Sequence, residues 1–562
     1  MSFFLCKDRK VMQALGMLGA FASIAILQNP ALAAPSLSQP GQDIRGQESM
    51  PEAEVRDDTP VTDKEGGEVQ FTITNFRLEA PDLSLDKAPL VQILQDGMGE
   101  GRTLTDLNAT IREITGYCRR HGYPAAAAYL PAQTSEDGVV VLKVIPGRYG
   151  EVKIDNHSRL KENVIKDFLV GLKKDKIIRT EELETVLYSL SDASGNKAVG
   201  VLEPGADFGS SDLTVRIEKG KGTNTILYVE NYGSTNTGRY RYGVQHSIYD
   251  VGGNGGRINV GALISNRKLH NYYANYETLV GHGGTTLGIG ISRMDYQVGG
   301  LLSALDANGT ALTLSLFGQR PIYHLHDRML TFKYGYDYRR LSDDIDAFNI
   351  DGEKHSHNVH VGLEGFRRVG GFALGFGGTL TLGHLTPDSE FTRDQTRYER
   401  TEGSYVKLEG NATAVQSLGH STDIMVRGSM QMANHNLDGS EQMYLGGANG
   451  VRAYPQGTGS GDEGIMATAE LRYHTPLQGL VASTYFDIGH VRYSHDGTLS
   501  GVVGGRPSSG MTLKGWGLGL AYTVPGDWFA RLDYARRIGG DPNLSEEAKA
   551  RGRLWFMLGK VW

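Results

Sequence analysis

One arginine in a glycine-rich stretch is the residue with the clearest potential chemistry in this chain. Residues 446–457 read GGANGVRAYPQG, so glycines flank Arg452 and could let this stretch fold back tightly. Further along the chain, Asp487 lies in the apolar run YFDIG, two residues before Gly489. A guanidinium and a carboxylate can pair through two parallel hydrogen bonds, which would fix the position of a loop. The alternative is a solvated loop arginine, the usual state of such residues.

Three other patterns resemble catalytic or metal sites but lack the context that such sites need. Residues 459–464 match G-x-G-x-x-G, but a strand follows them where a dinucleotide site requires a helix. The run 324–327 reads HLHD, and His355, His357 and His360 form a second histidine group, yet neither is completed to a tetrahedral ligand set. There is no G-x-S-x-G motif and no phosphate-binding loop of the Walker type. We therefore expect no enzymatic activity, no metal and no cofactor.

The start of the chain predicts export from the cytoplasm. Lys7, Arg9 and Lys10 precede an apolar run over 11–27, and the small residues ALA close at Ala33, so residues 1–33 read as a cleaved signal peptide. The apolar run is short for an uncleaved membrane anchor. After cleavage only Cys118 remains of the two cysteines, so no disulfide can form within the mature chain.

Composition narrows the class of protein further. The chain has 562 residues, 75 glycines and a net charge of -7 without a basic block, so nucleic acid is not an expected partner. Residues 34–67 are rich in Pro, Gly, Asp and Glu, and read as a linker or plug segment. Residues 68–146 predict a small α+β domain with the order strand-helix-helix-strand-strand. Residues 147–220 repeat that order, which indicates a tandem repeat.

From residue 223 to 562 the helical period disappears and about sixteen strands of about ten residues are predicted. These candidates cover 223–233, 239–251, 256–266, 269–280, 285–298, 309–322, 328–341, 355–368, 371–385, 403–417, 422–434, 464–475, 480–493, 511–524, 528–538 and 553–562. Tight turns alternate with connections that are often longer, such as 386–402, 435–463 and 494–510. This pattern, with apolar and small or polar residues alternating, favours a transmembrane antiparallel β-barrel over a soluble β-sandwich.

The same alternation predicts where Asp487 points. Its neighbours Phe486 and Ile488 would face lipid, so Asp487 would face the lumen of the barrel together with Gly489. The glycine leaves room for another group to approach. A loop folded into the lumen could then bring Arg452 to Asp487.

Several of these motifs resemble the two-partner secretion transporters of the TpsB type, the group that includes haemolysin-activator and filamentous-haemagglutinin exporters. The resemblance covers essentially all of residues 68–562, and the tandem repeat corresponds to two POTRA (polypeptide-transport-associated) domains. The residues that carry the resemblance to the first POTRA domain are Gly122, Tyr123, Pro124, Leu130, Pro131 and Gln133. Val451, Arg452, Ala453 and Tyr454 resemble the family's V-R-G-Y/F tip of the sixth outer loop. Asp487 and Gly489 resemble the D-x-G motif of the strand that receives it.

One residue departs from the family pattern. Ala453 stands where the family usually has glycine. If that position needs a positive φ, alanine is strained there and the conformation of the tip changes.

The resemblance implies a function that the residues alone do not. It implies a monomeric barrel in the outer membrane, with its N-terminal domains in the periplasm, that exports one large secreted exoprotein. The POTRA domains would bind the unfolded exoprotein by adding its segment to a sheet edge. Two alternatives stay open: an insertase for outer-membrane barrels, and a passive porin. The sequence names neither the exported protein nor any activation of it.

Overall fold

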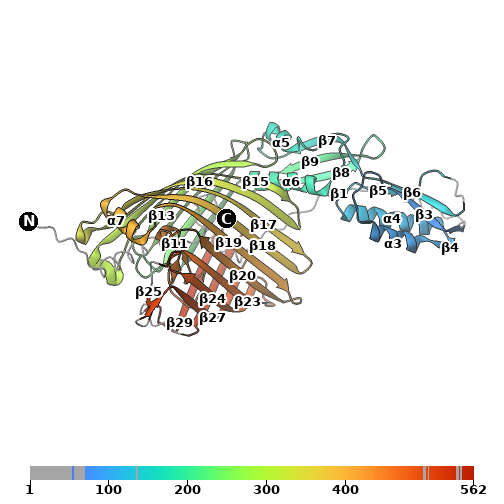
Figure 1. The fold of residues 1–562 in the computed structure, drawn as a ribbon. Helices are drawn as coiled ribbons and strands as arrows, with labels where there is room; N and C mark the ends of the chain where they lie inside the picture. Colours follow the sequence, from blue (N-terminus) through green and yellow to red (C-terminus); the bar gives the residue numbers. More distant parts are fainter. Residues whose placement is uncertain are drawn as a thin grey trace, which may run out of the picture.

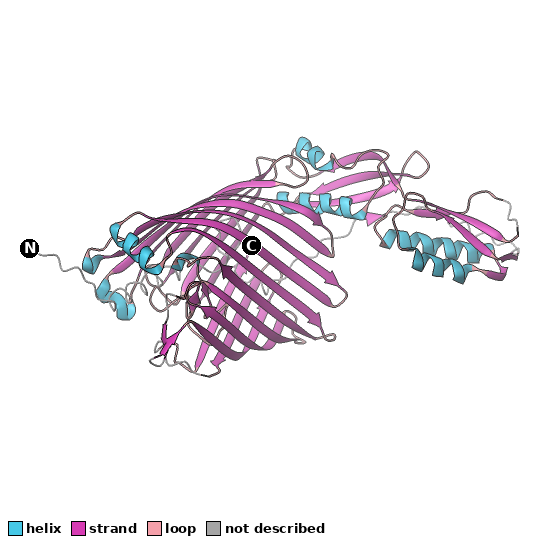
Figure 2. Ribbon diagram, viewed as in Figure 1, coloured by secondary structure: helices cyan, strands magenta, loops and turns pink. Residues whose placement is uncertain are grey.

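The computed structural model describes residues 54–55, 70–133, 137–497, 501–503, 506–539, 544 and 547–562. The predicted signal peptide, and all of the predicted linker except residues 54–55, lie outside the described residues. Two small domains project in a row from one end of a large β-barrel (Figure 1). Figure 2 shows that the helices of these domains lie against their sheets, whereas the barrel wall consists of strands.

The first small domain forms because two amphipathic helices cover one face of a short sheet. Its elements are β2 (Phe71–Ile73), β3 (Asn75–Glu79), α3 (Lys87–Gly97), β4 (Gly99–Arg102), α4 (Leu104–Arg120), β5 (Ala127–Tyr129) and β6 (Val139–Ile145). The main sheet has the order β3-β6-β5, and β2 pairs with β4. A capping box between Thr103 and Asp106 starts α4. Ile114 and Leu142 are fully buried in the core between helix and sheet.

The second small domain repeats this architecture, as the tandem pattern predicted. Its elements are β7 (Arg148–Asn156), α5 (Glu162–Leu169), α6 (Thr180–Ser194), β8 (Lys197–Pro204) and β9 (Ser210–Glu218). The sheet has the order β1-β8-β9-β7, because β1 (Glu54–Val55) adds to β8 as a parallel strand. Gly195 ends α6 with a φ of 67°, a left-handed conformation that glycine adopts without strain.

The prediction of a sixteen-stranded antiparallel barrel is confirmed. The strands are β10 (Thr223–Glu230), β11 (Arg241–Val251), β12 (Gly256–Ser265), β13 (His270–Leu279), β14 (Thr286–Gln297), β15 (Ala307–His324), β16 (Arg328–Ile345), β17 (Glu353–Val369), β18 (Phe372–Pro387), β19 (Gly403–Ser417), β20 (Thr422–Ala433), β23 (Glu463–His474), β24 (Leu480–Arg492), β27 (Gly510–Thr523), β28 (Trp528–Arg537) and β29 (Gly552–Val561). Each overlaps its predicted segment, and β10 pairs with β29 to close the barrel.

The two faces of the barrel wall differ as the alternation predicted. On β27 the outward side chains of Trp516, Leu518 and Leu520 are exposed. The residues between them are glycines that face the lumen beside large side chains of neighbouring strands. A Cβ on Gly517, for example, would lie 2.4 Å from the hydroxyl of Tyr485. Glycine therefore makes room for inward aromatic rings, which explains part of the high glycine content.

The connections at the far rim contain more structure than predicted. The connection 386–402 contains α7 (Glu390–Glu399), and the connection 494–510 contains the hairpin of β25 (Gly501–Val503) and β26 (Arg506–Ser508). Short 3-10 helices lie at η1 (Gly300–Leu305), η2 (Asp346–Phe348) and η3 (Gly439–Glu441). The strands β16 and β17 extend into the stretch 342–354, which the sequence analysis read as a loop. That expectation was wrong because the backbone ladder continues beyond the apolar band, where alternation is lost. Among the helices of the described residues, none is long and apolar enough to cross a membrane.

Candidate functional site

The loop between β20 and β23 folds back into the barrel and is buried along its tip. A two-residue ladder of β21 (Met443–Tyr444) with β22 (Ser460–Gly461) joins its two arms. Beyond it, the amides of Leu445 and Gly446 donate to the carbonyls of Gly459 and Thr458 at 2.9 and 2.8 Å. The residues of the predicted tip motif, Val451, Arg452, Ala453 and Tyr454, are 0–4% exposed. The loop is therefore a narrow hairpin with a buried tip.

Arg452 and Asp487 come together inside the barrel. The Nε of Arg452 donates to Asp487 Oδ2 at 3.0 Å and its Nη2 donates to Oδ1 at 2.9 Å. The backbone amide of Arg452 also donates to Oδ2, at 3.1 Å. Asp487 lies on β24 and is fully buried. The two parallel side-chain bonds give the fixed geometry of a bidentate pair.

Two further carboxylates bind the same guanidinium. The Nη1 of Arg452 lies 3.2 Å from Glu470 on β23 and 3.2 Å from Asp533 on β28. Arg531 offsets part of this negative charge, because its Nε lies 2.6 Å from Asp533. The ring of Tyr485 lies under the Arg452 guanidinium, 3.1 Å from Cζ to the ring centroid. Three carboxylates and an aromatic face thus surround one loop arginine.

Sequence reasoning missed Glu470 and Asp533 as partners. Glu470 lies on β23, where the alternation predicts a lumenal position, but many lumenal positions are polar, so position alone does not single it out. A usable signal was the run of inward glycines on β27, the strand between β24 and β28. Because Gly515, Gly517 and Gly519 lack side chains, Asp533 and the loop tip can approach across that strand.

The backbone of Arg452 is also bound to the last strand of the barrel. The indole Nε1 of Trp555 on β29 donates to the carbonyl oxygen of Arg452 at 2.7 Å. Trp555 is 1% exposed, and its ring packs edge-on against Tyr232.

The expected strain at Ala453 is absent. Among the described residues, those other than glycine with a positive φ do not include Ala453. Instead its Cβ occupies space beside Gly515, where a second Cβ would come within 2.6 Å. Gly489 provides room in the same way, because a Cβ there would lie 2.7 Å from Leu445 of the loop. The alanine therefore fits because the facing strand carries a glycine.

The base of the loop is held by a second set of buried charges that the sequence did not reveal. Lys354 Nζ lies 2.8 Å from Asp438 Oδ2, and both side chains are 3–4% exposed. Glu441 lies 2.8 Å from Lys407 Nζ and 2.6 Å from Arg339 Nη1. These cations come from β16, β17 and β19, which lie within four consecutive strands of the wall. The loop is thus bound at its tip and at its base.

The residues that carry the resemblance in the first small domain divide between two structural roles. The carbonyl of Gly122 accepts a hydrogen bond from the amide of Thr180 at 3.1 Å, and Arg179 lies over the ring of Tyr123. These contacts join the two small domains. Gln133 instead bonds both the amide and the carbonyl of Val141 on β6, at 2.8 and 2.7 Å. Leu130 is exposed, and Pro124 and Pro131 are half-buried.

The predicted histidine groups have other partners. His355 Nδ1 lies 2.8 Å from Asp388, whereas His360 is buried beside Asp337. The histidines of the run 324–327 contact the second small domain. Among the described residues, no group of three or more His, Cys, Asp or Glu side chains could hold a metal ion.

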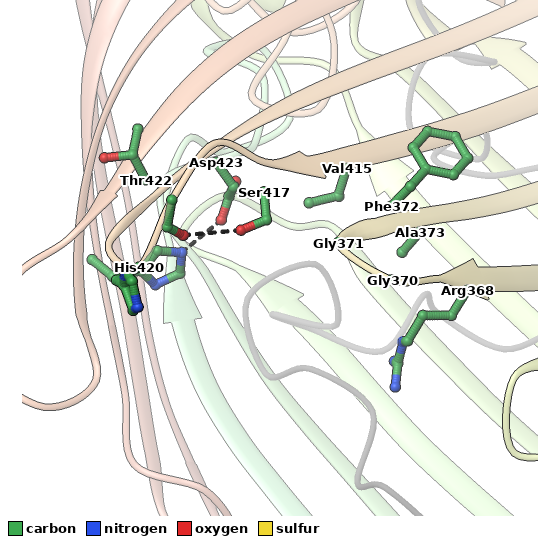
Figure 3. A pocket seen from close by; sticks show the side chains of 12 residues that line it. Arg368, Gly370, Gly371, Phe372, Ala373, Val415, Ser417, His420, Thr422 and Asp423 are labelled. Carbon is green, nitrogen blue, oxygen red and sulfur yellow. Dashed lines mark hydrogen bonds and ion pairs between the residues drawn. The ribbon is translucent and has the colours of Figure 1, made fainter.

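A pocket of about 210 Å³ lies at the rim that carries the tight turns (Figure 3). Arg368, Phe372 and Asp423 contribute to its lining. Asp423 is already paired, since Arg472 Nε and His474 Nε2 each lie 2.6 Å from one of its oxygens. Because this pocket contains none of the motif residues, the loop inside the barrel is the stronger candidate site.

Comparisons with known proteins agree with this architecture. A family model for the haemolysin secretion/activation proteins ShlB/FhaC/HecB matches residues 209–520, more than half of the chain. A model for the ShlB-type POTRA domain matches residues 71–147. The chain is 24% identical over 512 residues to the heme/hemopexin transporter protein HuxB of Haemophilus influenzae (strain 86-028NP), covering 90% of this chain and 89% of that protein.

Two further comparisons cover large parts of the chain. It is 22% identical over 427 residues to the hemolysin transporter protein HpmB of Proteus mirabilis, covering 73% of this chain and 74% of that one. The structure of CdiB from Escherichia coli has the same fold, with a TM-score of 0.68 and 17% identity over 100% of both chains. The two small domains are thus POTRA domains in the periplasm and the barrel spans the outer membrane, and the chain belongs to the haemolysin secretion/activation protein ShlB/FhaC/HecB family.

Proposed function

We propose that this chain exports one large cognate exoprotein from the periplasm to the cell surface through its barrel. The observation that carries the proposal is the combination of two POTRA domains with a lumen occupied by a loop on discrete anchors. The tip is held in the lumen by side-chain contacts, of which Arg452 and the charges at the base are the polar part, so the loop can leave without unfolding the wall. A passive pore has no need for such a releasable occupant.

The POTRA domains offer sheet edges to which an unfolded exoprotein segment could be added, although on β5 the amide of Ala128 is bonded to Thr115 Oγ1 at 2.9 Å and would have to be released. In the first domain β5 is an edge strand, and the chain next to it carries the exposed Leu130. Phe208 of the second domain is 81% exposed and contacts the ring of Tyr129 edge-on. An extended segment paired with β5 would place alternate apolar side chains beside these groups. We infer that the exoprotein presents amphipathic strands to this edge.

The edges of the second POTRA domain differ from each other. The edge of β8 is paired with residues 54–55 of the chain itself, whereas β7 ends the sheet on the other side. Strand addition at β8 would therefore require this segment to leave.

Comparing secreted proteins between strains tests the proposal. Culture medium and cell-surface fractions would be measured by mass spectrometry in the parent strain, a strain lacking this chain, and a strain complemented with it. We expect one large protein to disappear without the chain and to return on complementation. Loss of many outer-membrane barrels would favour an insertase, and unchanged proteins with altered small-solute uptake would favour a porin; either result would overturn the proposal.

A fourth strain, complemented with the Arg452→Ala variant, is added to this comparison. If it assembles at normal levels and still restores full export, the loop anchor does not take part in export. If export fails while other outer-membrane proteins stay normal, the proposed role of the loop stands. We also propose that the cargo is a single cognate exoprotein and that the barrel acts as a monomer.

A further inference from the structure

Two tight turns of the barrel contact the helices of the second POTRA domain. The turn 281–284 joins β13 to β14, and the turn 325–327 joins β15 to β16. The amide of His324, at the end of β15, donates to Thr185 Oγ1 on α6 at 2.9 Å. Gly284 lies so close to α6 that a Cβ on it would come within 2.9 Å of the Cβ of Ser189. The domain is therefore seated directly on the rim of the barrel, as Figure 1 shows for α6 beside β15.

Each of three histidines at this contact faces a carboxylate of the POTRA domain. His324 Nδ1 lies 3.2 Å from Asp192 Oδ2, and His326 Nδ1 lies 3.1 Å from Glu184 Oε2. In the neighbouring turn, His282 Nδ1 lies 3.9 Å from an oxygen of the Asp167 carboxylate and 3.2 Å from its backbone carbonyl. The histidine run that failed as a metal motif thus belongs to an interface between two domains. We call these three pairs the histidine contact.

Glu184 is buried at this contact, unlike the carboxylates of ordinary surface pairs. Its side chain is 5% exposed although it lies on a helix that faces the barrel. The backbone amide of His326 donates to Glu184 Oε2 at 3.2 Å, and the imidazole of the same residue lies beside both carboxylate oxygens. A buried carboxylate needs such partners, so its place in α6 depends on the docked turn.

His324 is also largely enclosed. Its side chain is 13% exposed and lies between two rings, 5.2 Å from Tyr188 on α6 and 6.5 Å from Phe366 on β17. A charge gained here is therefore felt mainly by Asp192. The aromatic neighbours fix the imidazole at the interface whether or not it carries a proton.

Other charged groups lie at the same interface. Arg328, which begins β16, lies 4.0 Å from Glu181 of α6, and Asp327 lies in the same turn as His326. The guanidinium of Arg257 on β12 also faces Asp192. As side-chain types, arginine and carboxylates keep their charge between about pH 5.5 and 8, whereas imidazole is the group that can change its charge in that range.

We propose that the histidine contact is a proton-dependent connection between the second POTRA domain and the barrel. Protonated imidazoles attract the facing carboxylates in the docked state and lose that attraction when the domain moves away. Docking is consequently stronger when the histidines are charged than when they are neutral. The pairs are partly exposed and each contributes little, so we expect about a tenfold fall in the ratio of docked to undocked domains from pH 5.5 to 8.0.

Distance measurement on the full chain in lipid nanodiscs tests this proposal. Spin labels would be placed by Lys174→Cys in the POTRA domain and Leu477→Cys in a turn of the barrel, both exposed positions. Cys118 is buried and stays unmodified. Pulsed electron–electron double resonance measures the distance between the two labels. It should give one narrow distance distribution at pH 5.5 and a broader one at pH 8.0.

Two variants complete the experiment. His282→Gln/His324→Gln/His326→Gln removes the titrating groups and keeps polar side chains, so its distribution should no longer change with pH. The matched control is His355→Gln/His357→Gln at the opposite rim, which should behave like the parent. Identical parent distributions at both pH values would overturn the proposal, and so would an unchanged pH response in the triple variant. This outcome is independent of whether an exoprotein is exported.

Discussion

The Cβ of Ala453 at the loop tip faces Gly515 on β27, and a Cβ added to Gly515 would lie 2.6 Å from it. The family motif usually has glycine at the tip, so this chain has a side chain on the loop and none on the wall. Both residues are buried, and Ala453 is 2% exposed. The fit of the loop in the lumen therefore depends on a pair of small residues, one from each side.

We predict that Gly515→Ala releases the loop tip. The two methyl groups cannot both fit, and overpacking of this kind costs about 1–3 kcal/mol. Single-channel conductance in planar bilayers should rise, because the tip no longer fills the lumen. The double variant Gly515→Ala/Ala453→Gly should restore the parent conductance. Gly375→Ala is the control, since a Cβ there would meet nothing within 4 Å; a rise in that variant would contradict the steric explanation.

Arg452→Ala should have a larger effect than the steric variant. It leaves Asp487, Glu470 and Asp533 buried, with Arg531 as the cation that still contacts Glu470 and Asp533, and removing one partner of a buried pair costs about 3–5 kcal/mol. Conductance should increase and export should fall while the barrel still migrates as a folded, heat-modifiable species.

Two further variants separate charge from geometry at the same position. Arg452→Lys keeps the charge but loses the bidentate contact, so an intermediate conductance is expected. The exchange Arg452→Asp with Asp487→Arg should fail to rescue, because Glu470 and Asp533 would repel the new aspartate. Full rescue by that exchange would show that the contact with Asp487 alone holds the tip.

The strands of the barrel could be predicted because the bilayer imposes their pattern. Within the apolar band each strand must alternate between lipid and lumen, and all sixteen predicted segments overlap strands. Beyond that band both faces of a strand meet water, so β16 continues to Ile345 through the acidic residues Asp343 and Asp344 without any apolar period. The sequence could not distinguish this extension from a loop.

The candidate site was only partly visible for a different reason. Arg452 and Asp487 stood out through motifs, whereas Glu470 and Asp533 come from strands whose distance from the tip depends on the curvature of the wall. The same holds for Lys354, which meets Asp438 from a strand five places earlier in the barrel than β24. Residue type and spacing therefore do not predict which lumenal side chains contact one another across a closed barrel.

The pair of Lys354 and Asp438 gives a test of the anchor at the loop base. Lys354→Met should loosen the base by about 3–5 kcal/mol, because it leaves the Asp438 carboxylate buried without its closest cation. The double variant Lys354→Met/Asp438→Leu should lose less, since an apolar pair can replace a buried ion pair. Hydrogen exchange of amides in the loop arms measures both. Equal exchange in the single and double variants would contradict the proposed anchor.

The pH dependence of α7 gives the last prediction. Glu399 ends this helix at the far rim, and burial, helped by the nearby Asp438 carboxylate, raises the pKa of Glu399 from 4.5 to about 7. The folded state therefore binds this proton more tightly than the unfolded segment does. The stabilising contribution is complete below pH 4.5 and is lost as pH rises to about 7. Local opening of α7, measured by hydrogen exchange corrected for the intrinsic pH effect, should be several-fold more frequent at pH 8 than at pH 5. Glu399→Gln should remove that difference, whereas Glu390→Gln at the other end of the helix should keep it. Equal opening of the parent helix at both pH values would refute this role of Glu399.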